Sequence, residues 1–352
     1  MRLLVVTQKV DRSDPVLGFF HGWLVEFAKR VEFLTVICLS RGEFDLPANV
    51  RVLSLGKEAG LSKAAYIARF YRYIWHYRHE YDSVFVHMNP EYVALGGLLW
   101  RWWRKRVGLW YVHRQVNPKL RIAAKLADRI FTSTRESFLL QSGKVSLMGH
   151  GVDLSAFKQT KLPDVLPRRI LCIGRITLIK NITAFVETMA LLNKHAPGVY
   201  EGQIVGAPAS EQDKEYEDRL RKLVAKEGLA GVIKFPGPKT SAQIPGLLES
   251  AWATINLSPT GGMDKVVLES LVCGRPVFLF NRAFETVLGG WAGLFVVEDG
   301  RVAGLVSKIE DFSAREDAGS LLKQLSDKVR AEYGLENLLT SILDNLNAET
   351  SR

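Results

Sequence analysis

The sequence predicts an α/β protein with two domains in tandem, each built on a doubly wound parallel sheet. Short runs rich in β-branched residues alternate with amphipathic stretches along the chain, which is typical of βαβ units around a parallel sheet. The length of 352 residues suits two domains of about 100–200 residues each, and a polar, proline-containing stretch at residues 155–167 separates the two series. We therefore expect a first domain over residues 1–160, a second over 161–330, and a C-terminal helix over 331–352. Packing of that helix back toward the first domain is one option.

Each expected strand is a short apolar run, and each expected helix is a longer stretch with helical periodicity. In the first domain, strands are expected at residues 3–7, 34–39, 50–55, 83–87, 108–113 and 129–132, with helices at 19–30 and 61–79. In the second domain, strands are expected at 169–173, 202–205, 232–235, 253–257 and 276–280, with helices from about 181, 211, 241 and 264, followed by 314–333 and 335–347. Ligands of open parallel sheets bind beyond the carboxyl ends of the strands, so two facing domains would place a site in the cleft between them.

Composition and cysteine content exclude several classes of protein. With 47% hydrophobic and 24% charged residues, the chain has an average globular composition and not that of a disordered, collagen-like or disulfide-scaffold protein. Cys38, Cys172 and Cys273 are scattered in apolar stretches, so we expect small hydrophobic thiols in a reducing compartment and no zinc knuckle. No stretch reaches the roughly 18 apolar residues of a membrane span. We expect a cytoplasmic protein, either free or peripheral on the inner face of the membrane.

The positive charge of the chain lies in its first half. Residues 1–160 contain 24 Lys and Arg against 13 Asp and Glu, whereas the remainder, with 23 against 24, is close to neutral. The densest cluster spans residues 100–106, and residues 64–79 mix Tyr, Trp and Arg. Such a mixture suits an anionic membrane surface, where rings lie at headgroup depth and guanidinium groups meet phosphates. The alternative is a solvated helix whose rings pack on its own core. No nucleic-acid motif accompanies the charge, so nucleic acid is not an expected partner.

The first candidate site is the stretch at residues 170–181. A strand is expected to end at Gly174, and Arg175 and Lys180 follow in the loop before a helix. Two cations beside the free N–H groups of a helix N-terminus can bind a diphosphate. The alternative is that both side chains are solvated.

The second candidate site is the stretch at residues 257–277. A strand leads through a Ser-Pro and Gly-Gly loop into a short helix that opens at Asp264. Glycines let the backbone approach a ligand closely, and the helix start directs N–H groups at it. Glu269 lies one turn into the helix, where a carboxylate can accept hydrogen bonds from two ribose hydroxyls. The alternative is a solvated glutamate on a helix surface.

Together these stretches resemble the retaining glycosyltransferases of the two-domain GT-B fold, specifically glycosyltransferase family 4 (glycosyl transferases group 1). The resemblance covers nearly the whole chain. Its landmarks are the Gly18 loop, Val112-His113 after a strand, residues 127–137 and 149–157, the Gly-Arg-x4-Lys loop, and the Glu269 helix followed by Cys-Gly-Arg-Pro-Val. The resemblance implies two Rossmann-like domains facing across a cleft, with a UDP- or GDP-sugar donor held by the second domain. It implies no metal.

The resemblance also implies roles for individual residues. Arg175 and Lys180 would neutralise the leaving diphosphate and so remove the need for a metal. Glu269 would bind the ribose, and His113 would lie near the transferred sugar. The loop of Gly18 would bring backbone N–H groups of the first domain toward the phosphates. The other residues that the resemblance places at the nucleotide are Gly237 in the stretch that would face the base, Gly262, Val267 and Leu268.

One position departs from the family pattern. The family's E-x7-E motif has its first glutamate eight residues before the second, and Gly261 stands there in this chain. Asp264 is the nearest carboxylate. It could replace the missing group at the sugar hydroxyls, with Lys265 adding a cation, or it could cap the helix. The departure leaves the identity of the sugar open.

The leading interpretation is a retaining, metal-independent glycosyltransferase that moves a sugar from a nucleotide diphosphate donor to an acceptor hydroxyl. A lipid-linked or cell-surface glycan is the expected acceptor, because the basic first half would face it. Two alternatives remain open. A nucleotide-sugar epimerase of the same fold would need the same diphosphate contacts, and a non-catalytic nucleotide-sugar-binding partner would fit a lost glutamate.

Overall fold

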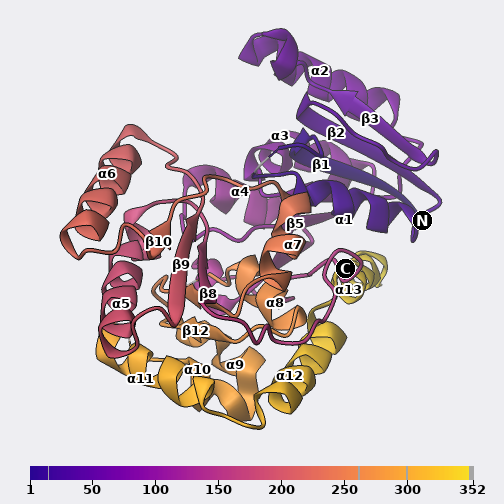
Figure 1. Cartoon of the computed structure of the whole chain (residues 1–352). Helices are drawn as coiled ribbons and strands as arrows, with labels where there is room; N and C mark the ends of the chain where they lie inside the picture. The colour runs from indigo at the N-terminus through magenta and orange to yellow at the C-terminus, as the bar shows by residue number, and fades with distance from the viewer. Residues whose placement is uncertain (15, 261, 299, 349–352) are drawn as a thin grey trace. The chain divides into compact units, whose positions relative to one another are not determined.

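The computed structural model of the chain describes residues 1–14, 16–260, 262–298 and 300–348. It divides into two compact units: Met1–Gly151 together with the C-terminal helix, and Val152–Gly334. Each unit has one parallel sheet with helices packed against it (Figure 1). The predicted fold class, two Rossmann-like α/β domains, is therefore confirmed.

The first unit contains a seven-stranded sheet in the order β3-β2-β1-β4-β5-β6-β7. Its strands are β1 (Arg2–Val10), β2 (Phe33–Arg41), β3 (Val50–Ser54), β4 (Ser83–His87), β5 (Arg106–Trp110), β6 (Arg129–Thr132) and β7 (Val145–Leu147). The six predicted strands are present, and β7 was missed because it is a three-residue edge strand without a buried side chain. The predicted end of β5 at residue 113 is wrong. The chain leaves the sheet after Trp110, and the Val112 N–H donates to the Met88 sulfur instead of a strand carbonyl.

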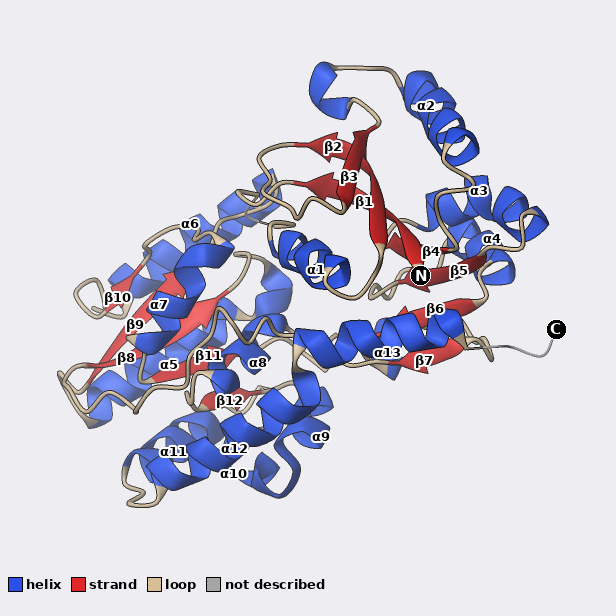
Figure 2. Cartoon of the chain, turned by 90° about the vertical axis from the view of Figure 1, so that its right-hand side faces the viewer, coloured by secondary structure: helices blue, strands red, loops and turns tan. Residues whose placement is uncertain are grey.

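Helices cover both faces of this sheet (Figure 2). Alternate residues of β1 separate the two cores: Leu3 and Val5 pack on one side, Leu4 and Val6 on the other. The first side carries α1 (Phe19–Ala28) and α13 (Leu335–Asn347), and the other carries α2 (Lys63–His76), α3 (Pro90–Trp102) and α4 (Pro118–Leu126). Two short 3-10 helices are η1 (Lys57–Ala59) and η2 (Arg135–Ser137). The last helix of the chain thus belongs to the core of the first unit.

The second unit contains a five-stranded parallel sheet in the order β10-β9-β8-β11-β12. Its strands are β8 (Arg168–Ile173), β9 (Tyr200–Val205), β10 (Ile233–Lys234), β11 (Ala253–Asn256) and β12 (Val277–Leu279), which confirms the five predicted strands. Its helices are α5 (Ile182–His195), α6 (Glu211–Lys226), α7 (Ile244–Glu249), α8 (Lys265–Val272), α9 (Glu285–Leu288), α10 (Ala292–Phe295), α11 (Val302–Ser313) and α12 (Ala318–Tyr333). The 3-10 helices are η3 (Leu178–Lys180), η4 (Ser241–Gln243), η5 (Arg282–Phe284) and η6 (Gly289–Trp291).

Arg275 attaches the stretch around residue 160 to the second unit. Its side chain is fully buried and donates to the carbonyls of Leu248, Glu249 and Lys161 and to the Thr160 hydroxyl. A buried guanidinium needs such partners, because an unpaired charge in a protein interior is costly. The polar stretch that looks like a linker in the sequence is therefore fixed to the fold at this point.

The three cysteines are unpaired and buried, as expected. Burial raises the pKa of Cys38 and of Cys172 to about 12 and that of Cys273 to about 11. The thiols therefore stay protonated at neutral pH and pack as small hydrophobic groups.

Candidate functional site

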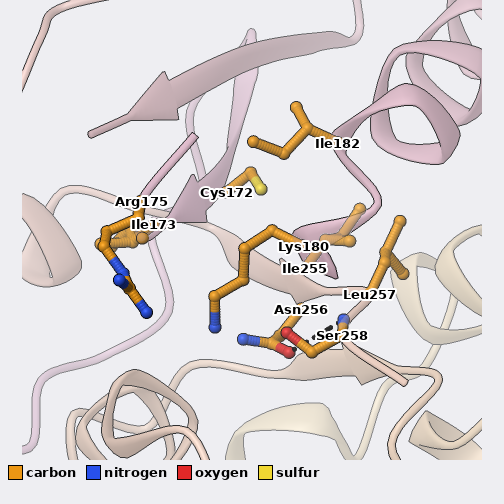
Figure 3. Close-up of a pocket in the computed structure, with 10 residues that line it drawn as sticks. Cys172, Ile173, Arg175, Lys180, Ile182, Ile255, Asn256, Leu257 and Ser258 are labelled. Atoms are coloured by element: carbon orange, nitrogen blue, oxygen red, sulfur yellow. Dashed lines mark hydrogen bonds between the residues drawn. The ribbon is translucent and has the colours of Figure 1, made fainter. Parts of the chain in front are cut away.

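The candidate site of the second unit lies where the order of its sheet reverses. The chain runs from β8 to β9 and β10 on one side and places β11 and β12 on the other, so β8 and β11 are neighbours. Ligands of doubly wound sheets bind at this point, beyond the carboxyl ends of the strands. A small, shallow pocket lies there, and Gly174, Arg175, Lys180, Asn256 and Ser258 help to line it (Figure 3).

Lys180 and Asp264 form an ion pair beside this pocket. The Lys180 Nζ lies 2.8 Å from Oδ1 and 2.7 Å from Oδ2 of Asp264, so the ammonium group bridges both carboxylate oxygens. Oδ2 also accepts hydrogen bonds from the Asn256 amide at 2.8 Å and the Ser258 hydroxyl at 2.9 Å. Two segments therefore converge on the carboxylate that precedes α8: the loop after β8, with Lys180, and the end of β11, with Asn256 and Ser258.

These contacts exclude one of the two roles considered for Asp264. Asp264 occupies the N-cap position of α8, but its side chain makes no capping hydrogen bond, so capping by the carboxylate does not occur. The carboxylate is instead directed at Lys180. Burial alone would raise the pKa of Asp264, but the charge of Lys180 and the three hydrogen-bond donors outweigh it, and the pKa lies below its usual value. Asp264 is therefore ionised at neutral pH and holds Lys180 in place.

Arg175 differs from Lys180 in having no internal partner. Its side chain is exposed and makes no ion pair or hydrogen bond with any residue that the structure describes. It follows Gly174 directly at the carboxyl end of β8, on the same pocket as Lys180 (Figure 3). A guanidinium in this position is available for a ligand and can give two parallel hydrogen bonds to a phosphate.

Gly206 allows the loops after β8 and β9 to approach each other. A Cβ at Gly206 would lie 1.8 Å from the carbonyl oxygen of Gly174, and the φ of +158° is one that side chains rarely adopt. The Gly206 N–H donates to the carbonyl of Gly237, which has a φ of +74° in the loop after β10. Gly174 and Gly206 therefore follow β8 and β9 directly, Gly237 comes three residues after β10, and the loops at these glycines lie close together.

Replacing Gly206 by alanine is expected to lower the free energy of unfolding by about 2 kcal/mol, because the loop after β8 must move away from the new methyl group. Urea denaturation of the whole chain measures the change. Gly231→Ala is the matched control, since a Cβ at that position would have no neighbour within 4 Å. Equal stability of the two variants would contradict the close approach of the two loops.

Glu269 and Lys265 lie one turn apart on α8, close enough for their charges to interact. Burial raises the pKa of the Glu269 carboxyl, and the charge of Lys265 opposes this rise. Burial lowers the pKa of the Lys265 ammonium, and the charges of Glu269 and Asp153 oppose this fall. A half-buried carboxylate of this kind can accept hydrogen bonds from ligand hydroxyls, the role predicted for Glu269.

The other residues predicted around α8 lie in different environments. The side chains of Val267 and Leu268 are buried in the core of the second unit, so only their backbones could meet a ligand. Gly262 is exposed, and its carbonyl accepts a hydrogen bond from the buried Asn281 amide. Gly261, where the family pattern has its first glutamate, lies outside the described residues.

Gly18 belongs to the first unit, at the start of α1. A Cβ there would lie 2.5 Å from the Asp14 carbonyl oxygen, so only glycine permits this turn. The N–H groups of Val16 and Leu17 donate to the Asp14 carboxylate and that of Gly18 to the Asp14 carbonyl. The backbone donors predicted to face phosphates thus have Asp14 as their acceptor in this structure.

His113 also belongs to the first unit and lies in the loop after β5. It is exposed, and its Nδ1 accepts a hydrogen bond from the Gln115 N–H at 3.1 Å. His113 is therefore not a core residue, and its ring is accessible to solvent. The buried histidine at the end of β4 is His87, which stacks on Phe20 at 4.0 Å and bonds Thr7.

Sequence reasoning missed the residues that support the cations. Asn256 and Ser258 hold Asp264, Gly206 sets the loop spacing, and Asp14 accepts the amides before α1. Asn256 and Ser258 could have been found, because polar residues at the carboxyl end of an otherwise apolar strand are expected to face a site. In the parts of the chain that the structure describes, no group of three or more His, Cys, Asp or Glu gathers into a metal site.

Comparison with protein families and curated proteins points to sugar transfer. A model of the family described as glycosyl transferases group 1 matches residues 167–314. The putative colanic acid biosynthesis glycosyltransferase WcaL of Salmonella typhimurium is 26% identical over 58% of this chain and 52% of its own length. The lipopolysaccharide core biosynthesis mannosyltransferase LpsB of Rhizobium meliloti is 26% identical over 62% and 61%. The chain thus spans between about two fifths and three fifths of the curated relatives it matches.

Solved structures share the fold over almost the whole chain. HepE of Anabaena in complex with UDP-glucose superposes with a TM-score of 0.76 at 15% identity, covering 99% of both chains. Sucrose-phosphate synthase of Thermosynechococcus elongatus gives a TM-score of 0.72 at 15% identity and covers 98% of both. At these identities the likeness establishes the GT-B fold.

Proposed function

We propose that this protein is a glycosyltransferase that takes its sugar from a nucleotide diphosphate-sugar. The observation that carries the proposal is the pair of cations at the sheet reversal: Arg175, whose side chain is exposed, and Lys180, which is held by Asp264. Both cations lie within residues 167–314, the stretch that the model of the glycosyl transferases group 1 family matches. The relatives named as glycosyltransferases and the structural neighbours bound to UDP or UDP-glucose support the same donor class.

The two cations would serve the leaving group. In the transfer step, the bond between the sugar C1 and the terminal phosphate oxygen breaks, and a bond from C1 to the acceptor oxygen forms. Negative charge develops on the departing diphosphate, and Arg175 and Lys180 would stabilise it more strongly in the transition state than in the ground state. Two such cations can replace a divalent metal, so we propose a reaction that needs none.

Retention of configuration is part of the proposal and follows from the family resemblance. The acceptor would attack on the face from which the diphosphate leaves, and the phosphate oxygen would take the acceptor proton. No protein nucleophile would then be needed. Glu269 would bind the ribose hydroxyls and so fix the nucleotide on α8.

For the acceptor we propose the hydroxyl of a lipid-linked or cell-surface glycan. The positive charge concentrated in residues 1–160 favours an acceptor presented near phosphate groups. The relatives named for colanic acid biosynthesis and for lipopolysaccharide core biosynthesis support an acceptor of this class. We propose a location in the cytoplasm, at the inner face of the membrane.

A ligand screen followed by product analysis tests the proposal. Thermal melts of the whole chain with UDP, GDP and ADP should show stabilisation by one nucleoside diphosphate, which identifies the donor base. The matching nucleotide sugars, incubated with a membrane lipid extract, should then give a glycosylated lipid and the free diphosphate. Protection by none of the nucleotides would overturn the donor site.

The same products separate the two alternative functions. An epimerase would change the nucleotide sugar in the absence of any acceptor. A binding partner without catalytic function would be stabilised by the nucleotide but would neither hydrolyse nor transfer the sugar with any extract. Either result would replace the transferase proposal while leaving the diphosphate site intact.

A further inference from the structure

The helical side of the first unit formed by α2, α3 and α4 has an outer surface suited to a lipid membrane. We propose that this surface docks on an anionic lipid bilayer by inserting aromatic and aliphatic side chains among the headgroups. The inference goes beyond the proposed transfer reaction and does not depend on it. It rests on exposed apolar side chains, on the contacts that place their helices together, and on the charge around them.

Six large apolar side chains on these helices have exposed fractions between 37% and 70%. We name them the docking set: Ile67, Tyr71, Trp75, Leu98, Trp102 and Ile122. On α2 and α3 they recur every fourth residue, which puts the members of each helix on one side. Large apolar residues gathered on neighbouring helices mark an interaction surface more often than scattered single ones do.

Direct contacts join the three helices that carry the docking set. The Tyr71 hydroxyl of α2 donates to the Leu95 carbonyl of α3 at 3.1 Å. The rings of Trp75 and Trp103, which follows α3, meet edge to face at 5.6 Å. Arg101 at the end of α3 donates to the carbonyl of Lys125 on α4 at 3.4 Å. The exposed side chains therefore belong to one continuous layer of helices (Figure 2).

The docking set is not needed for the core beneath it. The core on this side of the sheet is filled by other members of the same helices, Phe70, Ile74 and Trp100, which are fully buried. Among the aromatic residues of α2 and α3, one group packs on this core, with Tyr66, Tyr73 and Tyr92 partly buried, and a second group is exposed. The interpretation in which these rings pack only on their own core accounts for the first group alone.

Charge around the docking set is almost entirely positive. The three helices contain Lys63, Arg69, Arg72, Arg101, Lys119, Arg121 and Lys125, and their one acidic residue is Glu91. Glu91 is paired with Lys119 at 3.0 Å. Within the described part of the chain, Arg72, Arg101 and Arg121 make no ion pair, so their charge is available to an anionic surface. Glu80 and Asp82, after α2, are paired with Arg51 and Arg2.

An anionic bilayer is the one partner that uses both features. Tryptophan and tyrosine prefer the headgroup region, arginine pairs with lipid phosphates, and exposed isoleucine and leucine gain by leaving water. A nucleic acid would use the arginines but would leave Leu98 and Ile122 in contact with water. No helix in the described part of the chain is long and apolar enough to cross a membrane. Contact through a helical surface is the kind of association that this arrangement allows.

Vesicle cosedimentation of the whole chain tests the inference. The protein should bind vesicles of phosphatidylcholine mixed with phosphatidylglycerol, bind phosphatidylcholine alone at least about tenfold more weakly, and be released by salt. Trp75→Ala with Trp102→Ala should weaken binding about tenfold, and Arg72→Glu with Arg101→Glu should weaken it further. Both pairs of side chains are exposed, so circular dichroism spectra should show that the variants keep the fold of the unmodified protein.

Matched controls change the same properties elsewhere. Lys222→Glu with Lys226→Glu on α6 alters the net charge equally, and Val165→Ala with Leu166→Ala removes exposed apolar area. Neither control should alter vesicle binding. Absence of binding to anionic vesicles at low salt would overturn the inference. It would also be overturned if the Trp75 and Trp102 double variant bound these vesicles as tightly as the unmodified protein. Self-association abolished by Trp102→Ala, without vesicle binding, would assign the surface to a second copy instead.

Discussion

Replacing Arg175 and Lys180 together by alanine is expected to weaken binding of UDP, or of whichever nucleoside diphosphate protects the protein, by about a thousandfold. Each cation would give the diphosphate a charge-assisted hydrogen bond worth about 2 kcal/mol, and two such bonds correspond to roughly that factor. The loss is increased because the Asp264 carboxylate would then face the ligand without its counter-charge. Isothermal titration or thermal melts with the diphosphate measure the loss.

Single variants and a charge-matched control make this result interpretable. Arg175 is exposed and lacks an internal partner in the described structure, so Arg175→Ala should weaken binding about thirtyfold without changing stability. Lys180→Ala should also lower stability, since it removes the partner of Asp264. Lys222→Ala with Lys226→Ala removes two exposed cations of the same unit and should change neither property. Undiminished protection of the Arg175 and Lys180 double variant would refute the phosphate site.

The strands could be predicted from sequence because a strand that is buried on both faces is a short run of mostly apolar residues. The runs that form β4 and β6 contain mostly buried residues, and their predicted limits agree with the observed ones. The edge strand β7 has no buried residue and therefore no such pattern. The limit of β5 depended on a tertiary contact with the Met88 sulfur, which no local pattern encodes.

The charged residues of the candidate site could be predicted from the sequence, but the contacts that hold them in place could not. Arg175 and Lys180 stand out as cations that follow an apolar strand. Glu269 stands out as a carboxylate in the short helix that comes after another apolar strand. The role of Asp264 could not be chosen, because its partners Lys180 and Asn256 lie 84 and 8 residues away in sequence. Only the parallel pairing of β8 and β11 brings them together.

Internal carboxylates accept the donors that the family resemblance assigns to the phosphates. In the first unit Asp14 accepts the amides before Gly18, and in the second unit Asp264 accepts Lys180. An acceptor of this kind can act in two opposite ways. It can hold the donor in the geometry that the ligand needs, or it can compete with the ligand for the donor. Lys180 has three protons and Asp264 uses two contacts, so one proton of Lys180 remains for a phosphate. The geometry therefore favours positioning over competition at Asp264.

Asp264→Asn is expected to lower the free energy of unfolding by about 2 kcal/mol at neutral pH and to weaken diphosphate binding about tenfold. The amide keeps the shape of the side chain but directs a second donor at Lys180 and removes its counter-charge. The pKa of Asp264 lies below its usual value in the folded protein, so its ionised form stabilises the fold above the ordinary carboxyl pKa. That contribution is lost as the pH falls through the lowered pKa. The stability difference between the two proteins should therefore shrink in acid.

Urea denaturation between neutral and acidic pH, together with diphosphate titration, measures both effects. Asp218→Asn makes the same chemical change at an exposed position on α6 and should leave stability and binding unchanged at every pH. A difference between Asp264→Asn and the unmodified protein that persists in acid would mean that the ion pair is not its cause. Tighter diphosphate binding by the variant would identify Asp264 as a competitor of the ligand. If Asp264 positions Lys180 for the ligand, the variant should bind the diphosphate more weakly, and its loss of stability should shrink in acid. Both effects follow from the release of Lys180.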